Sequence, residues 1–324
     1  METVYATDRR RNELLACNPP ATIDKDKLDL FWSGALEKHG RKPLDVRREP
    51  AATPFKSVRA ERLTFAGHDD TPIRCWLLIP DFFGEDGGQK PCVVTFPGYT
   101  GDRGNPERYA GWLLQGFAVL AVDARGQGGE TGSLLTESSG SVKGWVSRGI
   151  TDIENSYYLA ITMDAVRAVD AAARQPEIDA SRIATVGASQ GGGLSLLAAA
   201  LNPKVGAVVA DIPNMCHMDH GVLHSGSSLS EIAAYVKRYP DRLNAVMETI
   251  AHFDLLNLAE RIEAPVLMSV GWKDTVCLPE TVYAVYNRIR SGKRINDYPY
   301  SGHEVSEFQT SQAYAFLREA FGLV

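Results

Sequence analysis

Several features that mark extracellular, metal-binding or membrane proteins are scarce or missing in this sequence. Its 324 residues include five cysteines, widely scattered and without a C-x-x-C pair. Reduced thiols fit this pattern better than a disulfide framework or a zinc site. No run of about 18 apolar residues occurs, and no apolar signal segment follows the N-terminus. We therefore expect a cytoplasmic protein that has no membrane partner.

An excess of positive charge is also missing. The formal net charge is −6, and the short basic run at residues 9–11 precedes no apolar segment. This balance argues against nucleic acid or an acidic membrane surface as a partner. The hydrophobic share of 44% is ordinary for a globular protein with a sizeable core. The length is compatible with one large α/β domain, and we expect residues 1–324 to form it.

Buried apolar strands alternate with amphipathic helices along most of the chain. This alternation implies parallel βαβ units and a three-layer α/β sandwich. Two alternating strands near the start, joined by a turn at residues 67–70, predict an antiparallel hairpin at the sheet edge. The strands are expected at 59–65, 73–79, 92–96, 118–122, from 183, and at 205–210, 264–270 and 293–298. The helices are expected at 24–39, 106–114, 155–173, 191–201, 281–290 and 305–321.

Three segments stand outside this alternation. Residues 1–50 predict a helical extension packed on the main domain, and 41–54 predict an extended connection. Residues 123–151 are long, irregular and rich in glycine and serine, which indicates a functional or interface loop. Residues 213–261 predict an inserted cap of two or three helices. The helix expected at 24–39 would pack on the main domain through an apolar stripe of Leu28, Leu30, Phe31, Trp32, Ala35 and Leu36.

Residues 183–194 carry the motif on which the functional interpretation depends. They predict a short strand, a tight turn and a helix, with Ser189 between Gly187 and Gly191 at G-x-S-x-G spacing. Such a turn strains the serine and exposes its Oγ, and side chains at the two glycines would collide with backbone. The positive end of the following helix favours an oxyanion. We interpret Ser189 as a nucleophile; the alternative is a solvent-exposed serine in a glycine-rich turn.

A serine nucleophile needs a base, and the base needs an acid that orients it. Where this motif occurs, the chain order is serine, acid and histidine, each just beyond the C-terminal end of a strand. Of the histidines after Ser189, only His303 follows the last expected strand, so we predict it as the base. Asp274 and Asp211 both follow strands. We favour Asp274, because the Ile-Pro pair after Asp211 suggests a structural turn.

An oxyanion would be held by the main-chain N–H after the nucleophile, that of Gln190, and by one from the loop at residues 97–101. Pro97 has no N–H to donate, so Tyr99 is our second donor. Arg125, after a neighbouring strand, is expected to tie loops together rather than to touch substrate. The histidines and methionines of 215–224 allow a metal site, but pocket lining is the favoured interpretation, and we predict no metal.

Three motifs together resemble the acetyl xylan esterase/cephalosporin C deacetylase family, carbohydrate esterase family 7 of the α/β-hydrolase superfamily. They are Arg125-Gly126-Gln127, the G-x-S-Q-G elbow around Ser189, and His303-Glu304. The resemblance covers nearly the whole chain. One departure is Pro97, because family members often carry His or Asn before the Gly-Tyr pair, which puts the preferred ester in question.

The resemblance implies a serine esterase that removes acetyl groups from small substrates, such as xylo-oligosaccharides and cephalosporin C, through an acetyl-enzyme. It implies no metal or organic cofactor. It also implies a homo-oligomer, a hexamer built as a dimer of trimers, with 128–144 as an interface extension. It assigns the triad and the oxyanion donors to the residues already derived, Ser189, Asp274, His303, Tyr99 and Gln190.

Other functions fit the same motif. A prolyl-oligopeptidase-like peptidase shares the fold, although the leading segment is too short for the β-propeller that such enzymes usually carry. A general short-chain carboxylesterase would use the same triad. A non-catalytic binding protein on a hydrolase fold usually loses a triad member, and none is missing here.

Overall fold

The structure is a computed structural model that describes residues 5–81, 88–137 and 140–323. Its described residues form a nine-stranded sheet with the order β1-β2-β3-β5-β4-β6-β7-β8-β9. The strands are β1 (Arg47–Pro50), β2 (Val58–Ala66), β3 (Pro72–Pro80), β4 (Lys90–Phe96), β5 (Ala118–Val122), β6 (Ile178–Ala188), β7 (Val205–Asp211), β8 (Val266–Gly271) and β9 (Lys293–Tyr298).

The sheet is antiparallel at one edge and parallel elsewhere. β1, β2 and β3 pair antiparallel with one another, and β3 pairs antiparallel with β5. All pairs from β5 to β9 are parallel. The edge hairpin is confirmed. The expectation of an extended connection over residues 41–54 is wrong in part, because Arg47–Pro50 adds a further edge strand along β2. The four residues of this strand, Arg-Arg-Glu-Pro, do not alternate between apolar and polar, so they give no periodic signal.

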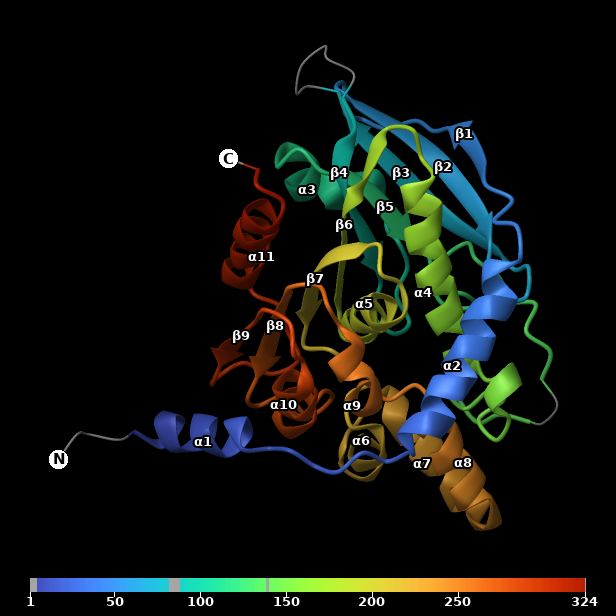
Figure 1. Ribbon diagram of the computed structural model, residues 1–324, viewed down its shortest axis with the longest axis vertical. Coiled ribbons are helices and arrows are strands. Elements are labelled where there is room, and N and C mark those ends of the chain that lie inside the picture. The colour runs from blue at the N-terminus through green and yellow to red at the C-terminus, as the bar shows by residue number, and fades with distance from the viewer. Residues whose placement is uncertain (1–4, 82–87, 138–139, 324) are drawn as a thin grey trace.

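Helices cover both faces of the sheet (Figure 1). One hydrophobic cluster joins α3 and α11 to one face, and a larger one joins α4, α5 and α10 to the other. This arrangement is a three-layer α/β sandwich. The helices are α1 (Ala6–Leu15), α2 (Lys25–Gly40), α3 (Ala110–Leu114), α4 (Tyr157–Ala173), α5 (Gln190–Leu201), α6 (Met218–His224), α7 (Ser228–Arg238), α8 (Leu243–Ala251), α9 (Leu255–Leu258), α10 (Pro279–Arg288) and α11 (Glu307–Ala320).

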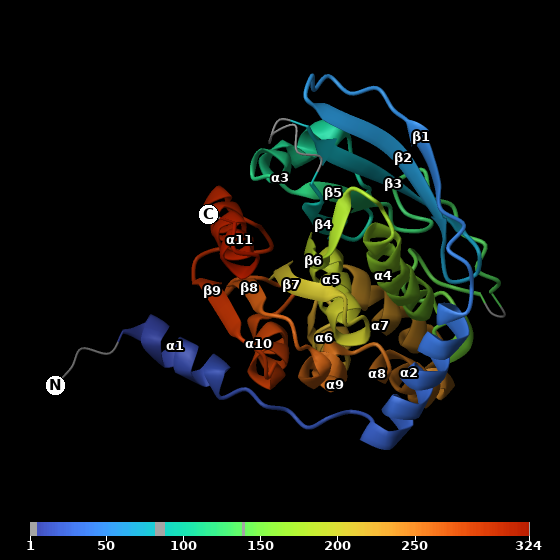
Figure 2. The ribbon, with the colours of Figure 1, turned by 45° about the horizontal axis from the view of Figure 1, so that its top comes forward.

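The N-terminal segment runs past the helices that follow the later strands, from α1 beside α10 to α2 (Figure 2). Asn287 of α10 donates to the carbonyl of Cys17, and Asn257 of α9 accepts from the N–H of Thr22. In α2, Trp32 is fully buried and donates to the carbonyl of His252. The predicted stripe is wrong at Leu30, which is 78% exposed because it lies on the opposite side of the helix.

The chain between β7 and β8 forms helices α6 to α9 and two short 3-10 turns. Four α-helices stand here, where the pattern predicted two or three, because the segment is broken at Gly226, at Pro240 and at Asp254, which caps α9. Residues 123–151, apart from 138–139, which lie outside the described residues, contain neither helix nor strand. Among the described residues, no helix is both long and apolar enough to cross a membrane.

Candidate active site

The turn between β6 and α5 holds Ser189 in a strained conformation. Its φ is 57° and its ψ is −121°, a region that residues with a side chain rarely adopt. A Cβ on Gly187 would overlap the backbone of Gly191, and a Cβ on Gly191 would overlap the carbonyl of Phe96. The predicted strain and the steric need for glycine are therefore confirmed. The hydroxyl of Ser189 stands at the C-terminal end of β6, where α5 begins.

A chain of hydrogen bonds connects the serine to a histidine and an aspartate far along the sequence. Nε2 of His303 lies 3.0 Å from Oγ of Ser189, and Nδ1 of His303 lies 2.7 Å from Oδ2 of Asp274. The His303 side chain is 29% exposed, whereas that of Asp274 is fully buried. The structure thus brings the three residues together in the order that proton transfer from serine to imidazole requires.

The loop after β8 fixes the Asp274 carboxylate. Oδ1 of Asp274 accepts from the N–H groups of Val276 and Cys277, at 2.7 and 2.9 Å. This leaves Oδ2 for the histidine. The competing Asp211 ends β7, and its Oδ1 accepts from Ser269 and Gln309, both at 2.7 Å. Asp211 therefore bonds to these two side chains and not to His303.

The two predicted oxyanion donors are main-chain N–H groups that follow β6 and β4. Gln190 begins α5, and Tyr99 lies in the loop after β4. Within the described parts of the chain, neither main-chain N–H donates to a protein acceptor. Oε1 of Gln127 accepts from the N–H of Thr100 at 2.8 Å, and its Nε2 donates to Oε1 of Gln190 at 2.9 Å. One glutamine side chain thus connects the two loops that carry the unpaired donors.

Arg125 lies two residues before Gln127 and anchors the loop that carries it. Its side chain is fully buried, and it forms two hydrogen bonds with Asp164, at 2.6 and 2.8 Å, and one with Asp69 at 2.8 Å. The hydroxyl of Tyr157 donates to the carbonyl of Arg125 and also receives a bond from Gln127. Arg125 therefore ties the loop after β5 to α4 and to the turn between β2 and β3. Gly126 takes a φ of 68°, which favours glycine.

The phenol of Tyr99 is held by residues that sequence reasoning missed. Its hydroxyl donates to Oε2 of Glu231 in α7 at 2.8 Å and accepts from the N–H of Trp145 at 2.9 Å. The rings of Tyr99 and Trp145 pack edge to face, 5.5 Å apart. Burial raises the pKa of Glu231. A Cβ on Gly144 would overlap the Glu231 carboxylate, and the φ of Gly144 is 86°.

Glu304, the second residue of the His-Glu pair, is not brought to the hydrogen-bonded set. It is exposed, and in the described structure its carboxylate makes no hydrogen bond. Cys277 does lie at the site: its Sγ, a carboxylate oxygen of Asp274 and a ring nitrogen of His303 lie within 4.8 Å of one another. Burial raises the pKa of this thiol, which disfavours the thiolate that binds metals. This arrangement suits a hydrogen-bonded triad better than a metal centre.

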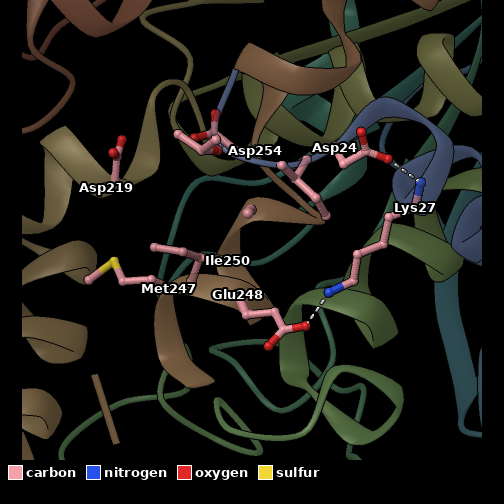
Figure 3. Close-up of a pocket in the computed structure, with 10 residues that line it drawn as sticks. Asp24, Lys27, Asp219, Met247, Glu248, Ile250 and Asp254 are labelled. Atoms are coloured by element: carbon pink, nitrogen blue, oxygen red, sulfur yellow. Dashed lines mark hydrogen bonds and ion pairs between the residues drawn. The ribbon is translucent and has the colours of Figure 1, made fainter. Parts of the chain in front are cut away.

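A cavity of about 580 Å³ lies away from these residues, between the N-terminal segment and helices α6 and α8 (Figure 3). Lys27 pairs with Glu248 at its edge, and Asp219 lies on the side away from Lys27. Burial raises the pKa of Asp254, which also lines it, to about 7. None of the described residues that line the cavity belongs to the serine, histidine and aspartate set.

Comparison with protein families and curated proteins gives a consistent result. The family model for acetyl xylan esterase, AXE1, matches residues 12–320. A curated relative, the acetyl esterase Axe7A of Xylanibacter ruminicola, is 27% identical over 295 residues, which are 88% of this chain. The match covers 64% of the length of that relative.

Solved structures agree with this match. An acetyl xylan esterase from Paenibacillus sp. R4 is 34% identical, with a TM-score of 0.91, and covers 95% of this chain and 98% of its own. Acetyl xylan esterase 1 from a Thermoanaerobacterium species is 30% identical, with a TM-score of 0.90, over 96% and 98% of the chains. The α/β hydrolase GrgF from a Penicillium species, 17% identical with a TM-score of 0.57 over 81% and 99%, shows the fold alone. The predicted α/β-hydrolase fold is confirmed.

Proposed function

This chain belongs to the acetyl xylan esterase family, and from that membership we propose that it is a serine esterase which removes acetyl groups from small acetylated substrates. The observation that carries the proposal is the continuous hydrogen-bonded path from Ser189 through His303 to Asp274. A hydroxyl, an imidazole and a buried carboxylate in this order form the machinery of acyl transfer.

In the first half of the reaction, Oγ of Ser189 attacks the acetyl carbonyl while Nε2 of His303 takes its proton. The Asp274 carboxylate holds the imidazole in the required tautomer and stabilises the imidazolium. The carbonyl oxygen becomes an oxyanion, which the N–H groups of Tyr99 and Gln190 stabilise. His303 then gives the proton to the leaving alcohol, and the acetyl-enzyme remains.

In the second half, water attacks the acetyl-enzyme by the same route. His303 takes a proton from the water, the two amides hold the second oxyanion, and the proton returns to Ser189 as acetate leaves. Nothing in this cycle requires a metal or an organic cofactor. Arg125 and Gly126 shape the loop from which Gln127 holds the two oxyanion loops in register. Glu304 stays an expected motif residue with no role in these steps.

A substitution of the nucleophile tests the proposal. Ser189→Ala should fold and lose nearly all turnover of p-nitrophenyl acetate, because the covalent step has no other nucleophile. Ser311→Ala, at an exposed serine of α11, is the matched control and should retain the activity of the unmodified chain. Undiminished turnover by Ser189→Ala would eliminate the proposal.

Within this class, the specific substrate that we propose is an acetylated xylo-oligosaccharide or cephalosporin C. A panel that sets acetylated xylobiose beside cephalosporin C and p-nitrophenyl esters of increasing chain length measures the preference directly. Acetyl esters should have the highest kcat/KM, and longer acyl chains should be poorer substrates. Dipeptide amides test the peptidase alternative. The two similar solved proteins are both named acetyl xylan esterases, which favours an ester over a peptide as the substrate.

Further expectations belong with this function. Residues 1–324 would act as one α/β-hydrolase domain, with 1–50 as an extension packed on it, 213–261 as a cap and 123–151 as an interface extension. The protein would be a homo-oligomer, a hexamer, with no nucleic-acid or membrane partner, and its five free cysteines support a cytoplasmic location. Light scattering of the purified protein tests the hexamer, and a mass near 35.4 kDa would contradict it.

A further inference from the structure

Three imidazole rings form a row at α6, outside the proposed catalytic residues. His217 precedes the helix, and His220 and His224 follow at steps of three and four residues, a spacing that puts them on one helix face. The rings of His217 and His220 stack with centroids 5.1 Å apart, and those of His220 and His224 lie 4.5 Å apart. Asp219 lines the cavity of Figure 3, but no histidine lines it.

Most ring nitrogens in this row have no hydrogen-bond partner among the described residues. Nε2 of His217 lies 3.3 Å from the Asp219 carboxylate, while its Nδ1 is buried without a partner. Within the described residues, the ring nitrogens of His220 and His224 form no hydrogen bond. His220 is half-buried and His224 is exposed, so a ligand that accepts lone pairs can reach their ring nitrogens from solvent.

We propose, in departure from the sequence-based expectation of no metal, that His220 and His224 form a binding site for a divalent transition-metal ion of the Zn²⁺ or Ni²⁺ class. Two histidines at i and i+4 on a helix reach one ion together, as in metalloprotease helices. Imidazole nitrogen suits zinc, nickel and copper, whereas Mg²⁺ and Ca²⁺ require oxygen ligands. Water completes the coordination, and His217 is a neighbour outside the pair.

The site lies beside the loop that carries the proposed catalytic acid, although it takes no part in the hydrolysis. The N–H of Gly226, just after α6, donates to the carbonyl of Thr275 at 3.0 Å. A helix of seven residues is marginal in isolation. An ion held across its last turn stabilises the folded form by mass action, and the melting temperature then rises with ion concentration.

Calorimetric titration of the full chain with Zn²⁺ at neutral pH tests the proposal. The unmodified protein should bind one ion at this site, and His220→Ala and His224→Ala should each weaken that binding by at least about tenfold, because each removes a ligand. His217→Asn is the matched control, since Asn tolerates the positive φ of 45° at this position, and it should retain the affinity. Mg²⁺ should not bind there.

Activity with p-nitrophenyl acetate separates this inference from the proposed function. Both alanine variants should keep the turnover of the unmodified protein in the absence of added metal, which also shows that they fold. Unchanged Zn²⁺ affinity in both variants would place the ion elsewhere, for example at Asp274, Cys277 and His303, and would overturn the inference. An unmodified protein that binds no Zn²⁺ would overturn it too.

Discussion

Asp211 and Asp274 occupy equivalent places in neighbouring strand-to-loop turns, yet their surroundings differ. Asp211 ends β7 and Asp274 follows β8, and both side chains are buried. Oδ1 of Asp211 accepts from two neutral side chains, and burial raises the pKa of Asp211 to about 6. Asp274 receives two main-chain N–H groups and pairs with an imidazole.

The difference shows that a carboxylate at the carboxyl end of a strand is not catalytic by position alone. Ser269 and Gln309 anchor Asp211 between β8 and α11, where it can hold packing together. The loop after β8 directs one oxygen of Asp274 to backbone and the other to His303. What each carboxylate can do follows from its partners.

The largest expected effect comes from neutralising each carboxylate in turn. Asp274→Asn should reduce kcat for p-nitrophenyl acetate by about 10⁴-fold, because an amide favours the wrong imidazole tautomer. Asp211→Asn should leave kcat within about threefold, since hydrogen-bond partners rather than charge hold that site. Steady-state kinetics of the two purified variants measures both. Equal losses in the two variants would remove the distinction between the carboxylates.

A smaller effect is expected at the glutamine that joins the oxyanion loops. Gln127→Leu should lower kcat by about 10- to 100-fold, because the N–H groups of Tyr99 and Gln190 lose their common support. Gln312→Leu, at an exposed glutamine of α11, is the matched control. The prediction concerns kcat; a change confined to KM would show that Gln127 acts on substrate binding instead.

Glu231 should act through the phenol of Tyr99. Glu231→Gln should lower kcat by about two- to tenfold, the range that one hydrogen bond supports. Tyr99→Phe should have a similar effect, and the double variant should be no worse than either single variant, because both remove the same contact. Additive losses in this double-mutant cycle would mean that the two residues act independently.

A last effect, on stability rather than on kcat, is a pH dependence at Asp211. Its folded pKa is about 6, above the ordinary 3.8, so the folded state binds more protons than the unfolded state between these values. The contribution of Asp211 to stability therefore falls as pH rises from about 4 to 6. Between pH 4 and pH 6, the free energy of unfolding of Asp211→Asn should rise relative to that of the unmodified chain by about 1–3 kcal/mol. Urea unfolding at pH 4, 5, 6 and 7 measures this gain, and a constant difference would contradict it.

Much of the fold and of the candidate site was predictable because local patterns carried it. The expected strand bounds at 118–122 and 293–298 match β5 and β9, since apolar runs between turns are local signals. The serine, histidine and aspartate followed from motif order and from strand ends. Ser189 and His303 are far apart in the sequence. They follow β6 and β9, and because these strands are parallel, their C-terminal ends lie at the same edge of the sheet.

Features that depend on contacts between distant segments were not predictable. Glu231 meets Tyr99 across 132 positions, and no local pattern records that contact. β1 pairs along the edge of β2, and Leu30 faces solvent although Leu28 and Trp32 are buried. Each of these outcomes is decided by tertiary packing, which overrides local preference.

Labelling with a fluorophosphonate probe, followed by peptide mapping, tests the central claim most directly. The probe reacts with a serine that a neighbouring base activates, so a single adduct on Ser189 is predicted, and it should be lost in His303→Ala. Absence of an adduct, or an adduct on another serine, would contradict an activated nucleophile at the β6–α5 turn.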